Sequence, residues 1–336
     1  MDANREDRAE RTSNLGKMST VAEGWHVPAR RLLCRNRKID SWEGMTDAAA
    51  EVMGKEVRNI SLDCHSFKGL EAQTVARAFV KLIKNLPNLR TLRIRHIPFT
   101  SFNALDSQSL RTTAFLPLLS ELSLHTSHFS HPVLSDLFAT NNHQVSRFTT
   151  QANQSVDSMP QEEEPLDFGG NLRFLKATRS AYTMISASSR ISFVGLRGLT
   201  ELVIHDPEPI SREREIELFS AVGPTLEKLT IRYCDPAFVK TCFPLLVRLT
   251  RLSLFCVEAN PASVVLNLPP SVAFLKISSD NSLEDVFLRW KANPALVPIG
   301  LKHIYIGRFY DRTTLANLPK LDKFSTKYTQ MLLSIL

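Results

Sequence analysis

Three histidines in the first half of the chain have a spacing that could bind a transition metal. His125, His128 and His131 form an H-x-x-H-x-x-H pattern, and imidazole nitrogens are good ligands for zinc and nickel. His125 directly follows an expected strand, however, and the other two histidines fall in the next turn. An irregular segment of this kind does not bring three rings together, so we expect no metal ion and no other cofactor.

Two further residues, Cys234 and Cys242, could carry thiol chemistry. The chain has five cysteines, an odd number, and no C-x-x-C pair. This argues against a disulfide framework and against a zinc ribbon. Cys242 is surrounded in sequence by Phe243, Leu245 and Leu246, so we expect both thiols to be buried and structural.

The sequence contains none of the short signatures that mark common catalytic sites. G-x-G-x-x-G, G-x-x-x-x-G-K-[ST], G-x-S-x-G and H-E-x-x-H are all absent. The acidic residues from Glu162 to Glu164 fall in an expected loop, without a companion base that could support acid–base catalysis. We therefore expect a protein that is not an enzyme.

A short repeat is the main structural signal. The pattern is an apolar residue, two residues, an apolar residue, one residue and a third apolar residue, as in Leu226-Leu229-Ile231. The first apolar positions of its ten copies are 57, 89, 119, 145, 172, 199, 226, 249, 272 and 301, at intervals between 23 and 32 residues. Leucine-rich repeats have a period of roughly 20–29 residues.

Each copy predicts one short strand. Its last two apolar residues are two positions apart, so they point to one face, and stacked copies form a parallel sheet with a column of leucines inside. Helical spacing of apolar residues over 72–86 and 216–222 predicts helices between strands, whereas Ser155–Gly170 reads as a loop. The sequence thus predicts an α/β leucine-rich-repeat solenoid, with parallel strands on the concave side and helices and loops on the convex side.

The repeats are irregular. Leucine-rich repeats usually carry Asn or Cys three residues after the third apolar position, and here only Asn153 and Cys234 do so. The hydrogen-bonded ladder that these side chains normally supply is therefore mostly missing.

The residues between the apolar positions of each strand should point outward and form the concave face. Across the ten strands, eight of them are basic and three acidic, a net charge of +5 out of the chain's formal +7. Aromatic residues beside arginines suit an anchoring interface. The predicted binding residues on this face are Arg93, Arg95, Arg147, Phe174, Lys176, Lys228, Arg232, Arg251, Phe255, Phe274, Lys276 and Tyr305.

The basic face predicts a protein partner with an acidic surface. Two alternatives stay open. Basic residues interleaved with aromatics also suit single-stranded nucleic acid, and some repeat proteins regulate GTPases. The first residues are charged, without the apolar region of a secretory signal, and no run of eighteen apolar residues occurs. We expect no membrane association and a cytoplasmic or nuclear protein.

Near the N-terminus the segment from Gly24 to Met45 resembles the junction after the F-box in fungal F-box/leucine-rich-repeat proteins. The matching residues are Trp25, Pro28, Ala29, Leu32, Leu33 and Arg35, and the repeat phrase LPNLRTLRI at Leu86–Ile94 is similar to the same family. The resemblance covers roughly residues 24–310. It implies substrate recognition by the repeats and recruitment of a cullin-type ubiquitin-ligase adaptor by the F-box.

The chain departs from that family before Trp25, where a Leu-Pro start and two apolar helices are absent. We therefore expect weak or no binding to the cullin-ligase adaptor. The domain organisation predicted from these patterns is a disordered segment over 1–23, a helical cap over 24–56 that resembles the end of an F-box, a repeat array over 57–310, and a C-terminal cap over 311–336.

Overall fold

The computed structural model describes residues 35–50, 55–67, 70–96, 118–126, 145–152, 168, 170–178, 193–205, 211–232, 234–255, 261–278, 293, 300–307 and 332–335. These residues form two compact units. Unit 1 holds the described residues up to 152, and unit 2 holds those from 168 onward. Each unit is an α/β solenoid, in which parallel strands stack in chain order and the segments between them lie along one face.

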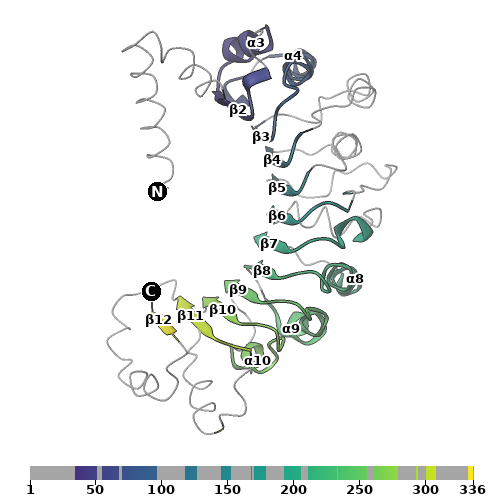
Figure 1. Cartoon of the computed structure of the whole chain (residues 1–336), viewed down its shortest axis with the longest axis vertical. Helices are drawn as coiled ribbons and strands as arrows, with labels where there is room; N and C mark the ends of the chain where they lie inside the picture. Colours follow the sequence, from purple (N-terminus) through teal and green to yellow (C-terminus); the bar gives the residue numbers. More distant parts are fainter. Residues whose placement is uncertain are drawn as a thin grey trace. The chain divides into compact units, whose positions relative to one another are not determined.

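Unit 1 has five parallel strands (purple to teal in Figure 1). They are β1 (Asn36–Ile39), β2 (Asn59–Asp63), β3 (Thr91–Arg95), β4 (Glu121–Thr126) and β5 (Arg147–Ala152). Each strand pairs with the next along the chain. Two helices, α3 (Trp42–Ala50) and α4 (Ala72–Lys84), contact one another, and the short helix η2 (Cys64–Phe67) contacts α3 and β3.

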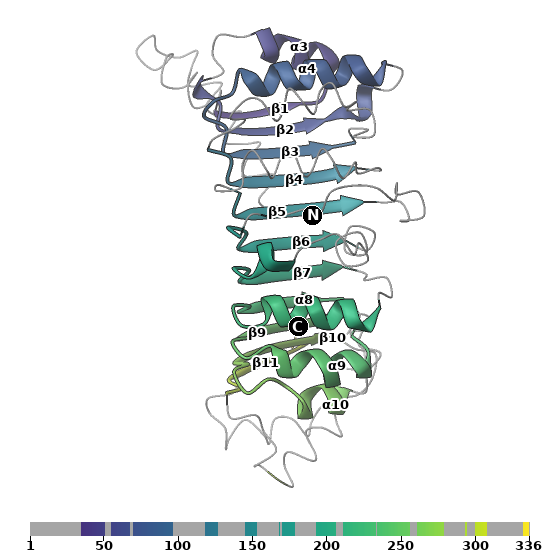
Figure 2. The same ribbon diagram turned by 90° about the vertical axis from the view of Figure 1, so that its right-hand side faces the viewer.

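Unit 2 continues the same design with seven strands. They are β6 (Phe174–Thr178), β7 (Glu201–His205), β8 (Lys228–Ile231), β9 (Arg251–Phe255), β10 (Phe274–Ser278), β11 (His303–Gly307) and β12 (Leu332–Ile335). The helices between them are η5 (Phe193–Leu196), α8 (Arg212–Val222), α9 (Pro236–Cys242), η6 (Phe243–Leu245) and α10 (Pro261–Leu266). Figure 2 shows α8, α9 and α10 on the same face of this sheet.

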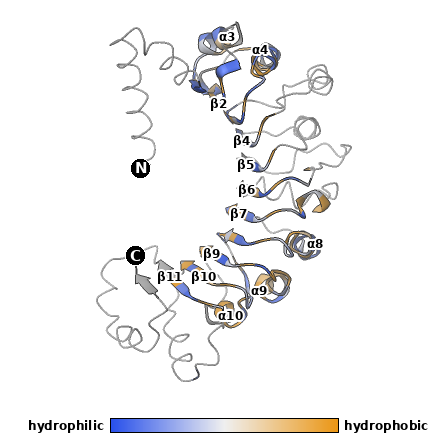
Figure 3. Cartoon of the chain, in the orientation of Figure 1, coloured by the Kyte–Doolittle hydropathy of each residue, from blue (hydrophilic) through white to orange (hydrophobic). Residues whose placement is uncertain are grey.

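The predicted register of the repeats is confirmed. All ten first apolar positions are buried, from Val57 to Leu301. Burial alternates along most strands, as on β3, where Leu92 and Ile94 are buried while Arg93 and Arg95 are exposed. On β4 the outward Ser123 is buried as well. We call the side of each sheet that carries the unburied residues its outward face, opposite the helices. Figure 3 shows the resulting mixture of hydrophobic and hydrophilic residues along the strands.

A backbone ladder at the start of the strands joins successive repeats. The N–H groups of Arg90 and Thr91 both donate to the carbonyl of Arg58, at 2.7 and 3.0 Å. The same two-to-one contact recurs at the starts of β4, β5 and β7 to β11. In several repeats a hydroxyl joins it; Thr200 Oγ1 donates to the Arg173 carbonyl at 3.0 Å and Thr250 Oγ1 to the Glu227 carbonyl at 3.1 Å. This ladder connects neighbouring repeats, most of which lack the Asn or Cys that usually links leucine-rich repeats.

The helices begin where local sequence stabilises a first turn. Ser211 Oγ accepts a hydrogen bond from the Arg214 N–H at the start of α8, and Asp235 Oδ1 accepts one from the Phe238 N–H at the start of α9. Proline follows Asp235 at the first helical position, where its missing N–H costs nothing. The predicted helix over 72–86 is confirmed by α4. Helix α8 begins four residues earlier than the 216–222 prediction, because its charged first turn carries no apolar signal.

Strands also occur inside the two segments that the sequence assigned to caps. β1 and α3 both lie within the expected helical cap over 24–56, and β12 lies within the expected C-terminal cap over 311–336. Of the predicted loop over 155–170 the structure describes only Phe168 and Gly170. The F-box-like residues Trp25 to Leu33 and the segment 1–23 lie outside the described residues. No helix in the described part of the chain has the length and apolar character needed to cross a membrane.

Candidate functional site

The outward face of unit 1 carries the predicted residues Arg93, Arg95 and Arg147, and all three are exposed. Arg93 lies beside Glu121 on the neighbouring strand, and its Nη2 donates to Glu121 Oε1 at 3.1 Å. Both side chains are partly exposed, so this ion pair contributes little to stability. Its main consequence is that one cation of this face is already paired with a carboxylate.

A second acidic residue of this face, Asp63, is also engaged. Asp63 Oδ1 lies 3.0 Å from His96 Nδ1 and accepts a hydrogen bond from the His65 N–H at 3.1 Å. Burial opposes ionisation of Asp63, but these hydrogen bonds outweigh it and hold the pKa of the carboxyl below its usual range. His96 has a φ of 61°, and its N–H donates to the His125 carbonyl at 2.7 Å. The contacts with Asp63 and His125 thus hold His96 in a left-handed conformation.

The outward face of unit 2 carries most of the predicted binding residues. Lys228 and Arg251 are exposed. The half-buried ones are Phe174, Lys176, Arg232, Phe255, Phe274 and Lys276. Tyr305 is placed by register beside Lys276 on the neighbouring strand. Lys228 Nζ lies 3.4 Å from Glu201 Oε2, a loose contact between partly exposed groups.

Several of these residues contact one another across strands β9 to β11. The sheet register places Phe274 between Arg251 and His303, and the Phe274 and His303 ring centroids are 6.5 Å apart. Lys276 Nζ lies 5.3 Å from the centroid of the Phe255 ring, within reach of a cation–π interaction. The structure therefore places Lys276 beside Phe255 and Arg251 beside Phe274 on this face.

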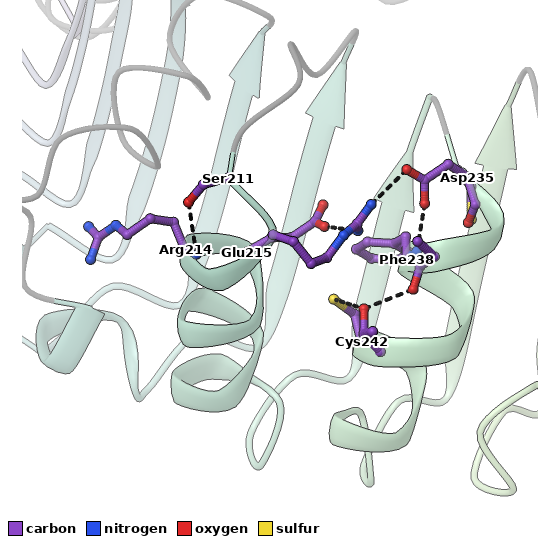
Figure 4. A network of polar contacts seen from close by, with 10 residues as sticks. Ser211, Arg214, Glu215, Asp235, Phe238 and Cys242 are labelled. Carbon is purple, nitrogen blue, oxygen red and sulfur yellow. Dashed lines mark hydrogen bonds and ion pairs between the residues drawn. The ribbon is translucent and has the colours of Figure 1, made fainter.

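The opposite face of unit 2 contains a polar network between α8 and α9 (Figure 4). The Arg212 guanidinium donates to Glu215 Oε2 and, at 2.7 Å, to Asp235 Oδ2. Burial raises the pKa of Glu215 to about 7, although the nearby Arg212 charge acts in the opposite direction. Since Asp235 also starts α9, we interpret this network as a connection between two repeats.

Cys234 and Cys242 are buried, as predicted. Burial, helped by the nearby Asp235 carboxylate, raises the pKa of Cys234 to about 12, and burial raises that of Cys242 to about 11. Both thiols are therefore protonated at neutral pH, whereas the reactive form of cysteine is the thiolate. This favours a structural role for both residues.

The predicted histidine triad is only partly described. His125 is half-buried at the end of β4, while His128 and His131 lie outside the described residues. In the described ranges no three His, Cys, Asp or Glu side chains are grouped so that they could hold a metal ion.

Sequence reasoning did not single out His303, nor the contacts of Asp63 with His65 and His96. The outward position of His303 follows directly from the repeat pattern, but histidine was not counted among the charged and aromatic residues of the face. His65 and His96 follow the third apolar positions of their strands, where repeat boundaries are hardest to predict.

Comparisons with known proteins give no family for this chain. No family model matches it, and no curated protein matches it. Among solved structures it is similar to a crystal structure of a protein from Bacteroides fragilis, at 12% identity and a TM-score of 0.42, over 100% of this chain and 83% of that one. A likeness of this size supports no conclusion about fold or function. The class that the fold and the face define is therefore an α/β solenoid protein, with a basic and aromatic outward face on unit 2.

Proposed function

We propose that this chain is a leucine-rich-repeat protein that acts as a non-catalytic scaffold for protein recognition, similar in role to the substrate-recognition part of an F-box/leucine-rich-repeat ubiquitin-ligase receptor. A cytoplasmic or nuclear location and an acidic protein partner belong to the same proposal. The repeats support this proposal, because all ten copies bury their first apolar residue and place their outward residues on parallel strands.

One observation carries the proposal. The outward side chains of unit 2 stand on strands whose backbones are fixed by pairing on both sides, and the helices occupy the other face. A rigid support lowers the entropy that a binding surface loses on complex formation. Phenylalanine and arginine, two of the residue types gathered there, are enriched at protein interfaces.

The test compares the partners retained by the full chain and by single variants in cell extract, with quantitative mass spectrometry. Arg93→Glu and Arg251→Glu change the outward faces of units 1 and 2. Lys81→Glu and Lys240→Glu are matched controls, because both lysines are exposed on helices α4 and α9. We expect specific partners to be lost with an outward-face variant and kept with both helix variants. The reverse pattern would contradict the proposal.

Single-stranded nucleic acid is the second candidate, because Phe174, Phe255 and Phe274 are half-buried aromatic side chains beside cations. Oligouridine binding to the full chain, measured at two salt concentrations, separates the candidates. Phosphate contacts make nucleic-acid binding fall steeply with salt. Tight, salt-sensitive binding of oligouridine would favour this second candidate.

A further inference from the structure

Five outward residues of unit 2 lie on three adjacent strands. Lys228 is on β8, Arg251 and Phe255 are on β9, and Phe274 and Lys276 are on β10. The register places Lys228, Arg251 and Phe274 side by side, at a strand spacing of about 4.8 Å. We call these five residues the β8–β10 patch. Two neighbouring cations at this spacing can both reach one carboxylate.

The patch keeps its positive charge. Among the described residues, Glu201 is the carboxylate in contact with the patch; its Oε2 lies 3.4 Å from Lys228 Nζ. Arg251 is exposed and forms no ion pair within the described ranges. Lys276 interacts with the Phe255 ring, which leaves its charge uncompensated. Three cations therefore face a single loosely paired carboxylate, and a negatively charged ligand complements them.

The patch also offers apolar surface. Phe255 and Phe274 are both half-buried, so part of each side chain remains open to solvent. The Phe274 ring has its neighbour His303 at a centroid distance of 6.5 Å, in a tilted arrangement. Partly open rings that are held by strands can bury an apolar side chain of a ligand at little entropic cost.

We propose that the β8–β10 patch binds an acidic peptide segment of a protein partner, with carboxylates at Lys228 and Arg251 and an apolar side chain against Phe274. The inference rests on the proposed protein-recognition function and locates it in unit 2. A peptide fits better than single-stranded nucleic acid because Lys276 already lies over the Phe255 ring, where a base would have to stack.

The test uses the full chain and short fluorescent probes in anisotropy titrations at low and moderate salt. The probes are peptides built of Glu-Glu-Phe, Glu-Glu-Ser and Lys-Lys-Phe repeats, together with oligouridine. We expect the Glu-Glu-Phe peptide to bind most tightly and the Lys-Lys-Phe peptide not to bind. Tighter binding of oligouridine, or equal binding of the acidic and basic peptides, would overturn the inference.

Variants locate the binding. Arg251→Glu or Lys276→Glu should weaken the Glu-Glu-Phe peptide at least about tenfold, because like charges placed face to face are strongly unfavourable. Lys240→Glu on helix α9, on the opposite face of the same unit, is the matched control and should change affinity less than about twofold, since exposed charges separated by more than about 8–10 Å are largely screened. Phe274→Ala should weaken the Glu-Glu-Phe peptide but leave the Glu-Glu-Ser peptide unchanged.

Circular dichroism and the melting temperature of each variant verify that it folds. An equal loss with Lys240→Glu, or no loss with Arg251→Glu, would contradict this inference alone. The proposed function would still stand if extract partners were lost with another outward-face variant. It would fall if those partners were insensitive to every outward-face variant while the helix variants released them.

Discussion

The outward faces of units 1 and 2 share one strand geometry and differ in chemistry. On β2 to β5 the described face is polar, and its carboxylates Asp63 and Glu121 each contact a neighbouring basic side chain. On β6 to β11 the face carries three phenylalanines and five cations against the single carboxylate Glu201. The same alternation of buried and outward residues thus supports a surface whose carboxylates already have side-chain partners in unit 1, and a basic, aromatic surface in unit 2.

The inner sides of the two sheets differ as well. In unit 2 the described inward positions of β6 to β11 are all apolar, whereas in unit 1 one inward position of β5 is a threonine, Thr150. The Thr150 hydroxyl is buried and has no hydrogen-bond partner among the residues that the structure describes. One backbone design therefore accommodates a polar residue on the inside, while the residue types on the outside alone determine the chemistry of the outward face.

The largest expected effect concerns the apolar column of unit 2. Leu229 is 1% exposed on β8, so Leu229→Ala should lower the free energy of unfolding by about 2–5 kcal/mol. The matched control is Thr230→Ala on the outward side of the same strand, which should cost less than about 0.5 kcal/mol. Urea denaturation checks both, after coincidence of two spectroscopic probes has shown a two-state transition. Equal costs for the two variants would refute the inward–outward distinction.

The second prediction concerns Glu215, whose polar network belongs to unit 2. Its pKa in the folded chain, about 7, lies above the ordinary 4.5. The unfolded chain therefore loses this proton first, and stability should fall as pH rises from 4.5 to 7, by up to about 3 kcal/mol. Glu215→Gln should flatten that dependence of the free energy of unfolding. Glu217→Gln, on the same helix at an exposed site, is the control and should leave the slope unchanged.

A third prediction tests whether the inner side of unit 1 can be made like that of unit 2. Thr150→Val keeps the shape of the side chain and removes its unpaired hydroxyl. An unsatisfied buried polar group costs about 1–3 kcal/mol, so the variant should raise the free energy of unfolding by about 1 kcal/mol or more. Thr230→Val, outward on β8, provides the comparison and should have little effect. A loss of stability with Thr150→Val would show that its hydroxyl is satisfied after all.

The smallest expected effect on stability comes from the surface ion pair of unit 1. Glu121→Gln should cost less than about 1 kcal/mol, because the pair with Arg93 is partly exposed. The same change leaves Arg93 uncompensated and brings the charge of this face closer to that of unit 2. If charge alone separated the two faces, the Glu-Glu-Ser peptide would gain affinity for this variant. The affinity of the Glu-Glu-Phe peptide should rise by no more than that of the Glu-Glu-Ser peptide, since β2 to β5 carry no outward Phe, Tyr or Trp.

Sequence patterns predicted the strands well because each strand has two apolar residues at a fixed spacing on one face. They missed β1, where Arg37 pairs in register with Ile60 and occupies an inward position. Because this position carries a charged residue, the apolar pattern that marks the other strands is interrupted in β1. They also missed β12, which follows a segment without a clear repeat.

The candidate face could be predicted residue by residue, because the side on which a strand residue points depends only on its parity. The contacts across strands could not be predicted. Whether Arg93 meets Glu121, or Lys276 meets Phe255, depends on side-chain conformations that strand pairing alone does not determine. The network of Arg212, Glu215 and Asp235 was missed because it joins two helices from different repeats.

Because of the two-to-one backbone ladder at the strand starts, the alignment of neighbouring strands does not depend on how many residues connect them. Successive first apolar positions are between 23 and 32 residues apart along the chain, yet within each unit every strand that the ladder holds starts in step with its neighbour. Insertions and deletions can therefore accumulate among the connecting segments without shifting the outward rows. If the outward face recognises a partner as proposed, a lineage carrying this fold could change that partner by exchanging single outward residues, while the spacing between outward positions stays constant.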